Sequence, residues 1–318
     1  MSHILKTFKS LLVKLLTDIV LPFKKQKPLK KYIRKLLIDA SLLTIFKVWR
    51  HQKEWNKQKD FKYYLTFVLC VKDEADYILE WIEYCLLQGV EHFYVYNNNG
   101  TDNTEELLKP YIDKGLVTWL VYPGKSKQRE IYNHALKTHR FETRWMGFVD
   151  VDEFIVSPSY RPLADILKDY ENYSQLSIAC VAYGTSFHQY KTDDLVIERF
   201  TMHEKGVGRI VKSIINPRKT VAADVHLHAV LGPTVDEKYE LLYAAYPKNP
   251  TANVLRINHY VTKSVEEAMG KLQKGGSSRS AAVYQKMNWF ERVNKNEEED
   301  KPNIMAPYIP LLKQKLKK

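Results

Sequence analysis

Cysteine is scarce in this sequence, and its three residues, Cys70, Cys85 and Cys180, form no C-x-x-C pair. An odd count without close pairs argues against a disulfide framework and against a structural zinc site. Proteins that lack disulfides are typical of reducing compartments. We therefore expect a cytoplasmic protein.

Long apolar runs are also absent. No stretch reaches the roughly 18 consecutive apolar residues of a membrane-spanning helix. Met1-Ser2-His3 leads into a segment punctuated by lysines, without the small-residue cleavage site that ends a secretory leader. The sequence predicts neither a transmembrane helix nor a cleaved leader.

Acidic residues are rare at the N-terminal end. The formal net charge is +12, and residues 1–62 hold 16 Lys and Arg against Asp18, Asp39, Glu54 and Asp60, so this arm carries the whole excess. Nucleic-acid-binding proteins usually spread basic residues over the surface that contacts the nucleic acid. Because the rest of the chain is neutral overall, we expect no nucleic-acid partner.

The basic arm, residues 1–60, is predicted to be helical and amphipathic. Between Leu5 and Phe23 apolar residues recur at helical spacing, with lysines between and after them. Such a helix suits an anionic membrane surface, contacted through residues 5–35, on the inner face of the cytoplasmic membrane. It equally suits docking on the catalytic body or on a partner subunit.

Residues 61–275 alternate between β-rich apolar runs and segments of helical spacing. The predicted strands cover residues 63–71, 92–96, 116–122 and 145–149, and the predicted helices cover residues 73–88, 104–112 and 127–138. This alternation requires a mostly parallel sheet covered by helices on both faces. The predicted fold class is therefore α/β, followed by a helical tail over residues 276–318.

Polar clusters follow three of the predicted strands: Lys72-Asp73-Glu74, Asn97-Asn98-Asn99 and Asp150-Val151-Asp152. The carboxyl ends of parallel strands meet at one edge of a sheet, so these clusters should converge on a ligand site. On an extended backbone the two aspartates of the third cluster would share a face, and Glu153 would point away. Two carboxylates on one face suit Mg²⁺ or Mn²⁺ bound to a diphosphate.

Further motifs complete a combination that occurs in a known family: Lys72-Asp73-Glu74, residues 77–84, Gly89, Tyr96-Asn97-Asn98, Asp102-Asn103-Thr104 and Phe148-Val149-Asp150-Val151-Asp152-Glu153-Phe154. Over about residues 62–275 the chain resembles the glycosyltransferases of family 92 and related family-2-like enzymes of bacterial surface polysaccharide and lipopolysaccharide biosynthesis. It departs from the family pattern at Asp73, where Asn is usual, and at Asn97-Asn98, where an Asp is expected.

The resemblance implies a GT-A fold and a metal-dependent hexosyltransferase that inverts the anomeric carbon. The expected donor is a nucleotide sugar, with galactose on UDP as the first guess, and the expected acceptor is a glycan or glycolipid. Mn²⁺ or Mg²⁺ would be the cofactor. Its ligands would be Asp150, Asp152 and His259, because GT-A enzymes often add a C-terminal histidine to the acidic pair.

The resemblance also implies donor contacts, at Lys72, Glu74, Asn98, Asp102, Gln128, Arg129, Asp150 and Lys212. At two of these places a purely structural role fits the sequence as well: Asp102 precedes a helical run and is a typical N-cap, and the basic loop before Gln128 could simply be solvated. An inverting transfer needs a carboxylate to accept the proton of the attacking hydroxyl. Asp224 is our candidate for this base, in competition with Asp193, Asp194 and Glu204.

Two other functions use part of the same pattern. A nucleotidyltransferase also has paired aspartates on a nucleotide-binding sheet, but it should carry a glycine-rich first loop, and residues 72–75 contain no glycine. A non-catalytic adaptor that binds glycans at a membrane surface would combine the basic arm with a degenerate transferase domain. Such an adaptor would tolerate the loss of Asp150 and Asp152.

Overall fold

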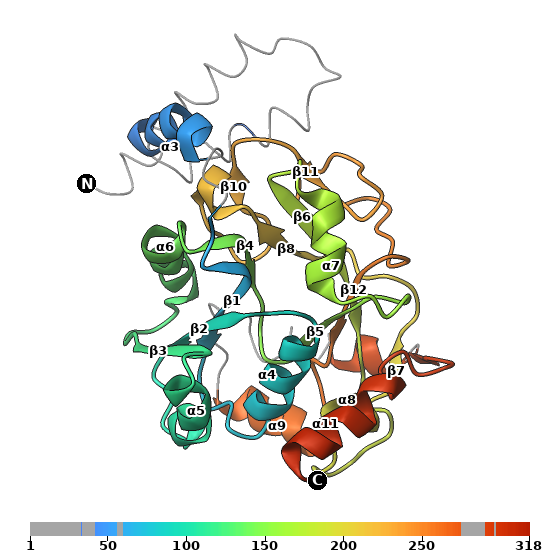
Figure 1. Ribbon diagram of the computed structural model, residues 1–318. Coiled ribbons are helices and arrows are strands. Elements are labelled where there is room, and N and C mark those ends of the chain that lie inside the picture. The colour runs from blue at the N-terminus through green and yellow to red at the C-terminus, as the bar shows by residue number, and fades with distance from the viewer. Residues whose placement is uncertain (1–32, 34–41, 56–59, 275–289, 296) are drawn as a thin grey trace, which may run out of the picture.

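The structure, a computed structural model, describes residues 33, 42–55, 60–274, 290–295 and 297–318. At its centre lies a nine-stranded sheet flanked by helices (Figure 1). Along the sheet the strands follow the order β3 (Val117–Val121), β2 (His92–Asn97), β1 (Tyr63–Val71), β4 (Thr143–Phe148), β8 (Val211–Ile215), β6 (Gln175–Ala182), β12 (Arg256–His259) and β5 (Glu153–Val156), and β11 (Thr234–Val235) also pairs with β6.

The N-terminal half of the sheet is parallel. Helices connect its strands: α4 (Ile78–Leu87) follows β1, α5 (Thr104–Asp113) follows β2, and α6 (Gln128–His139) follows β3. The ends of these elements lie within two residues of the predicted ones, except that α4 begins at Ile78 rather than at Asp73. The predicted fold class, an α/β domain with a mostly parallel sheet flanked by helices, is confirmed.

Strand β1 is mostly apolar because both of its faces are covered, and its one threonine, Thr66, is buried as well. Side chains alternate across a strand, so Phe67 packs with Trp81 of α4 on one face. Val68 belongs to a second cluster, on the other face, together with Ile131 and Tyr132 of α6. Burying one such side chain contributes about 1.5–3 kcal/mol to the free energy of folding.

The C-terminal half of the sheet is mixed. β8 runs antiparallel to β4 and β6, while β12 runs parallel to β6 and antiparallel to β5. In the last pairing His259 lies opposite Glu153, and the amide of Tyr260 donates a 2.8 Å hydrogen bond to the carbonyl of Asp152. A segment more than a hundred residues downstream thus completes the surroundings of the acidic motif.

Smaller elements surround the sheet: α7 (Leu163–Leu167), α8 (Val196–Arg199), β7 (Met202–Glu204), η3 (Pro217–Lys219), β9 (Thr220–Ala222), β10 (Ala229–Val230), α9 (Val265–Lys274), β13 (Glu297–Glu299), η4 (Ala306–Tyr308) and α11 (Ile309–Leu316). β13 pairs antiparallel with β7, and α11 lies against α4 (Figure 1). The C-terminal segment therefore contributes a strand as well as helices, and it packs on the same body as the sheet.

Helix α3 (Leu42–Trp55) docks through Val48 on Val221 and Ala222 of β9. The predicted amphipathic segment, residues 5–35, lies outside the described residues apart from Ile33. Within the described part of the chain, no helix is long and apolar enough to cross a membrane.

Candidate active site

The acidic motif lies in a turn between β4 and β5. The amide of Glu153 donates a 3.0 Å hydrogen bond to the carbonyl of Asp150, and Val151 and Asp152 form the turn. The prediction of an extended backbone across this motif is therefore wrong. Glu153 does not point away either, because its carboxylate accepts a 3.0 Å hydrogen bond from the amide of Asp150. The side chain of Glu153 thus closes the turn.

Asp150 is held by groups from two neighbouring elements. Its Oδ2 lies 2.8 Å from Lys212 Nζ on β8, and its Oδ1 accepts a 3.1 Å hydrogen bond from Gln128 Nε2 at the start of α6. Lys212 also lies 3.3 Å from Glu153. Burial lowers the pKa of Lys212, but the two carboxylates outweigh it and raise the pKa well above its usual value. Lys212 and Gln128, two of the predicted donor contacts, thus both contact Asp150.

Asp152 has a different set of partners. Its Oδ2 lies 2.7 Å from Lys271 Nζ on α9, and its Oδ1 lies 3.5 Å from His259 Nε2. Burial raises the pKa of Asp152, but the charges of Lys271 and His259 outweigh it and bring the pKa well below its usual value. For His259 the two effects have the opposite signs: burial lowers its pKa, but the Asp152 carboxylate outweighs burial and raises the pKa above its usual value. Each group thus favours the charged form of the other.

Helix α9 is fixed at its N-terminal end by a capping box. The amide of Ser264 donates to Glu267 Oε2 at 3.0 Å, and the amide of Glu267 donates to Ser264 Oγ at 3.2 Å. Glu267 also pairs with Arg199 at 3.2 Å and accepts a hydrogen bond from Tyr77. Residues four apart share a helix face, so this anchor directs Lys271 towards the acidic motif.

Two further ionisable groups interact with this cluster. Burial raises the pKa of Glu74 to about 7, although the charge of Lys263 opposes the shift. Burial and the nearby charge of Lys271 lower the pKa of Lys263. Glu74, from the loop after β1, was predicted from the sequence, whereas Lys263 and Lys271 were not assigned a role. The site thus combines several carboxylates with several cations.

The chemistry of Asp150, Asp152 and His259 suits a divalent cation, since carboxylate oxygen and imidazole nitrogen are ligands for Mn²⁺. Among the residues that the structure describes, however, no group of three His, Cys, Asp or Glu side chains is arranged to hold a metal ion. Lys212 and Lys271 neutralise the two aspartates instead. A cation at Asp152 would therefore compete with an existing ion pair.

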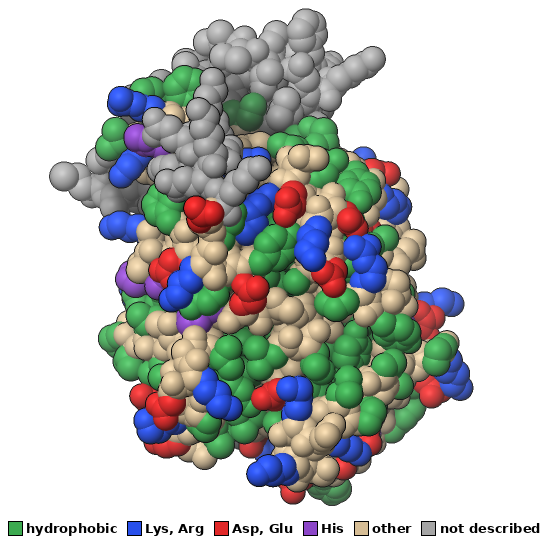
Figure 2. All heavy atoms as spheres, viewed as in Figure 1, with side chains coloured by type: hydrophobic (Ala, Val, Ile, Leu, Met, Phe, Trp, Pro, Cys, Tyr) green, Lys and Arg blue, Asp and Glu red, His purple; other side chains and the backbone are tan. Residues whose placement is uncertain are grey.

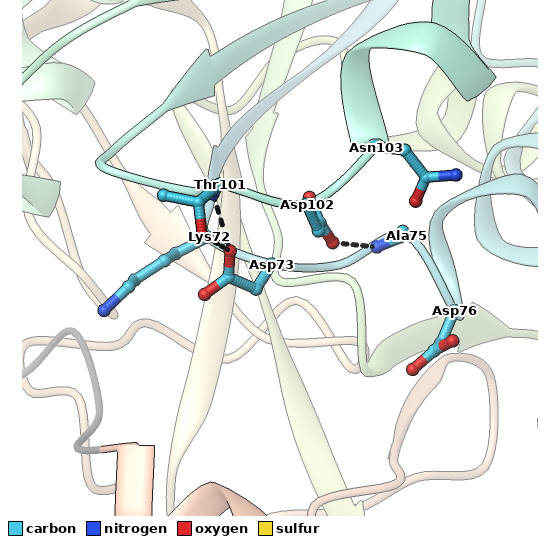
Figure 3. Close-up of a pocket in the computed structure, with 7 residues that line it drawn as sticks. All are labelled: Lys72, Asp73, Ala75, Asp76, Thr101, Asp102 and Asn103. Carbon is cyan, nitrogen blue, oxygen red and sulfur yellow. Dashed lines mark hydrogen bonds between the residues drawn. The ribbon is translucent and has the colours of Figure 1, made fainter.

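A cavity of about 460 Å³ lies between the loops that follow β1 and β2 (Figure 3). Its polar lining comes from Lys72, Asp73, Asp76, Thr101, Asp102 and Asn103. Asp73 accepts a 2.7 Å hydrogen bond from the amide of Thr101, whereas the side chain of Lys72 extends away from the carboxylates (Figure 3). The cavity has the position expected for the nucleoside of a donor.

Asp102 and Asn98 mainly hold these loops together. Asp102 accepts hydrogen bonds from the amide and the hydroxyl of Thr104 at the start of α5, at 3.1 and 2.6 Å, and from the amide of Ala75 at 2.8 Å. Asn98 donates to the carbonyls of Tyr122 and Gly124, both at 2.8 Å. Asp102 thus bonds to the first residue of α5, although Asn103 occupies the N-cap position itself.

The start of α6 brings Arg129 close to the predicted base. Arg129 Nε lies 4.0 Å from Asp224, whose own carboxylate accepts a 2.8 Å hydrogen bond from the amide of Val225. Gln128, the preceding residue, contacts Asp150. Asp224 therefore belongs to the same end of the sheet as the acidic motif.

The three competing carboxylates lie elsewhere in the fold. Asp193 and Asp194 are exposed in the loop before α8, and Glu204 lies on β7, where it pairs with Arg292 at 3.3 Å. None of the described contacts connects them to Asp150 or Asp152. Asp224 remains the better-placed candidate of the four.

The sequence contained a signal for the residues that were missed. Ser264-Val265-Glu266-Glu267 has the spacing of a capping box, and a lysine follows four residues after its glutamate. That pattern predicts where α9 starts and which face carries Lys271. It does not say that this face meets Asp152, because the contact spans 119 residues.

Several known proteins are similar to this chain in sequence or in structure. A "Glycosyltransferase family 92 protein" of Ricinus communis is 25% identical over 281 residues, which are 84% of this chain and 46% of the relative. A "Galactan beta-1,4-galactosyltransferase" of Arabidopsis thaliana is 29% identical over 170 residues, covering 47% of this chain and 32% of the relative. The chain thus spans less than half the length of these relatives. The solved structure of S. aureus TarS 1-349 in complex with UDP has a TM-score of 0.34 and 15% identity, over 48% of this chain and 47% of that one.

The family model of glycosyltransferase family 92 matches residues 66–305, which include β1, the acidic turn, β12 and α9. The match therefore takes in both the sheet and the cluster around Asp150 and Asp152. This protein belongs to glycosyltransferase family 92.

Proposed function

We propose that this protein transfers a hexose, in the first instance galactose, from a UDP-sugar to a hydroxyl group of a glycan or glycolipid. Its family membership supports glycosyl transfer, and the names of the Arabidopsis relatives support galactose. The observation that carries the proposal is the acidic turn, which lies at the same edge of the sheet as the cavity. Carboxylates and lysines gather there at the carboxyl ends of β1, β2 and β4, where an α/β sheet binds nucleotides.

A divalent cation at Asp150, Asp152 and His259 would offset the negative charge that develops on the departing diphosphate. In this proposal the chain does the rest of the positioning. Lys212 holds the carboxylate of Asp150, and the turn closed by Glu153 fixes the backbone of the motif. The loops after β1 and β2, fastened by Asp102, enclose the nucleoside.

Asp224 is the proposed base. In an inverting transfer it would accept the proton of the acceptor hydroxyl while the bond from the sugar to the diphosphate breaks on the opposite face. Its partial exposure and its place beside Arg129 leave room for an acceptor. Asp224→Asn should then lower kcat while donor binding is retained.

The first test is a panel of UDP-, GDP- and CMP-sugars, measured for binding and for slow donor hydrolysis with and without Mn²⁺. We expect cation-dependent hydrolysis of one donor that is lost in Asp152→Asn. Asp165→Asn, an exposed substitution on α7, is the matched control and should behave as the wild type. Absence of any nucleotide-sugar binding by the wild-type protein would refute the proposal.

The same panel separates the alternatives. A nucleotidyltransferase would use the corresponding nucleoside triphosphate together with a sugar phosphate and release pyrophosphate. An adaptor would bind glycans in the Asp152→Asn variant as well as in the wild type. Either result would replace the transferase proposal.

The proposal extends to a membrane-proximal acceptor. Leu43, Phe46 and Trp49 lie on the outward face of α3 and are 79%, 53% and 60% exposed, beside Lys47 and Arg50. Charges of both signs are interspersed over the body in Figure 2, whereas the arm before it is basic. This combination suits an anionic lipid surface.

Co-sedimentation with phosphatidylglycerol vesicles tests this extension. The double variant Phe46→Ser, Trp49→Ser should lose binding relative to the wild type. Phe187→Ser, which removes another exposed aromatic residue, should not. Equal binding of all three proteins would exclude α3 as a membrane contact.

A further inference from the structure

Lys263 is a buried cation that lies against an aromatic ring. The residue is only 6% exposed, and its Nζ lies 4.1 Å above the ring of Tyr77. Within the described ranges of the chain, no carboxylate lies within 4 Å of this nitrogen. Lysine is almost never buried in this way unless it is paired, because desolvation of the charge is unfavourable.

The backbone holds Lys263 in place at a conformational cost. Its φ is 54°, in the left-handed region that residues with a Cβ rarely adopt. Thr262 and Ser264 on either side are buried, and Ser264 begins the capping box of α9. Strained residues persist where the surroundings determine them, and they cluster at ligand sites.

Lys271 shares this location but is placed differently. Its side chain is 54% exposed, and its Nζ lies 2.7 Å from Asp152. The charges of Lys263 and Lys271 repel each other across the site. An anion between them would relieve this repulsion and would give Lys263 a directly bonded partner.

The position of the two lysines suggests the identity of this anion. Lys263 follows β12, whose His259 contacts Asp152, and its charge also acts on Glu74 in the loop after β1. Lys263 lies against Tyr77, which directly follows the cavity residue Asp76, and Lys271 contacts Asp152 of the acidic turn. A nucleotide whose base and ribose occupy that cavity would direct its phosphates to this point.

We propose that Lys263 and Lys271 form the subsite that binds the diphosphate of the donor. This inference rests on the proposed function. Lys263 is the fixed part of the subsite, and Lys271 exchanges the carboxylate of Asp152 for a phosphate oxygen when the donor binds. Both ammonium groups then stabilise the charge of the leaving diphosphate.

Calorimetric titration of Lys263→Met with pyrophosphate, UDP and uridine, each with and without Mn²⁺, tests the subsite. We expect the affinity for pyrophosphate and UDP to fall at least about tenfold, whereas uridine, which lacks phosphates, should bind as it does to the wild type. Because methionine removes a buried charge with little change in volume, Tm should stay equal or rise. Lys109→Met, on the exposed face of α5, is the control lysine.

Unchanged pyrophosphate affinity in Lys263→Met would overturn the inference. If that variant is destabilised instead, Lys271→Met decides, because its lysine is half-exposed and should be dispensable for folding: reduced pyrophosphate affinity supports the subsite, and wild-type affinity refutes it. A wild-type protein that binds pyrophosphate through these lysines but binds no nucleotide sugar would retain the subsite and refute the proposed donor.

Discussion

Asp150 and Asp152 stand two residues apart in one turn, yet their lysine partners have little in common. Lys212 comes from a central strand and is 4% exposed, and it contacts two carboxylates. Lys271 comes from a helix at the edge of the site, is 54% exposed and contacts one. A buried lysine on a strand cannot move without disrupting the sheet, whereas a half-exposed lysine on a helix changes rotamer freely.

The difference divides the motif into a framework side and an exchangeable side. Asp150, Lys212 and Glu153 form a closed network that also fixes the turn. Asp152 is instead paired with Lys271 and the side chain of His259, which a ligand can replace. Binding of a diphosphate to Lys271 should therefore rearrange the surroundings of Asp152 more than those of Asp150.

The largest effect should follow loss of the framework lysine. Lys212→Met leaves Asp150 and the buried Glu153 without their cation, and breaking a buried ion pair in this way costs about 3–5 kcal/mol of unfolding free energy. Urea denaturation measures this loss. Adding Glu153→Gln to Lys212→Met should recover part of it, because the remaining buried charge is then removed.

A loss below about 1 kcal/mol in Lys212→Met would mean that this side is as exchangeable as the other. The comparison between the two aspartates would then fail.

The anchor of α9 should give the next largest effect. Burial raises the pKa of Glu267, but hydrogen bonds from Ser264 and Tyr77 outweigh it and bring the pKa to about 2. Glu267→Gln should cost about 2 kcal/mol at neutral pH, because hydrogen bonds to a charged group and the pairing of Arg199 are weakened. Glu266→Gln, at the exposed neighbouring position, is the matched control.

The pH dependence of this effect has a defined sign. A carboxylate with a lowered pKa in the folded state stabilises the protein above its unfolded pKa of about 4.3, and this contribution is lost as the pH falls towards about 2. The stability difference between wild type and Glu267→Gln should therefore be constant near neutrality and shrink between about pH 4 and 2. A difference that does not change with pH would show that the carboxylate is not ionised in the folded protein.

Sequence reasoning succeeds here where local pattern decides the structure. The mostly apolar, β-rich run of Tyr63–Val71 predicts β1 to the residue, because a strand buried on both faces lacks the alternation of apolar and polar residues. The start of α4 was misplaced at Asp73, since the left-handed φ of 55° at this residue and the tie from Asp102 to Ala75 keep the loop out of the helix. Neither constraint leaves a local periodic signal.

In the acidic turn, by contrast, contacts between distant segments decide the structure. Asp150 and Asp152 were identified from their position after a predicted strand, and that position is correct. Their geometry depends on β12, because Tyr260 bonds to the carbonyl of Asp152 and His259 lies opposite Glu153. No spacing in the sequence specifies such pairing between distant segments, so the partners of the two aspartates could not be predicted.

The smallest effect should come from the exchangeable lysine. Lys271→Met should change the unfolding free energy by less than about 1 kcal/mol, since Lys271 itself is half-exposed and water can replace its ammonium group. Without nucleotide, however, Mn²⁺ should bind about two to five times more tightly to this variant, because Asp152 no longer has a competing ammonium group. Electron paramagnetic resonance of free Mn²⁺ measures this directly, without any enzyme assay.

Lys109→Met, which breaks an exposed pair on α5, should leave Mn²⁺ binding unchanged. Weaker Mn²⁺ binding in Lys271→Met would show that the lysine supports the metal site rather than competing with it. Asp152 would then belong to the framework as firmly as Asp150 does, because the ammonium group would be holding the carboxylate in its binding position. Whether Mn²⁺ binds more tightly or more weakly to Lys271→Met therefore decides whether the partners of Asp152 are exchangeable while those of Asp150 are fixed.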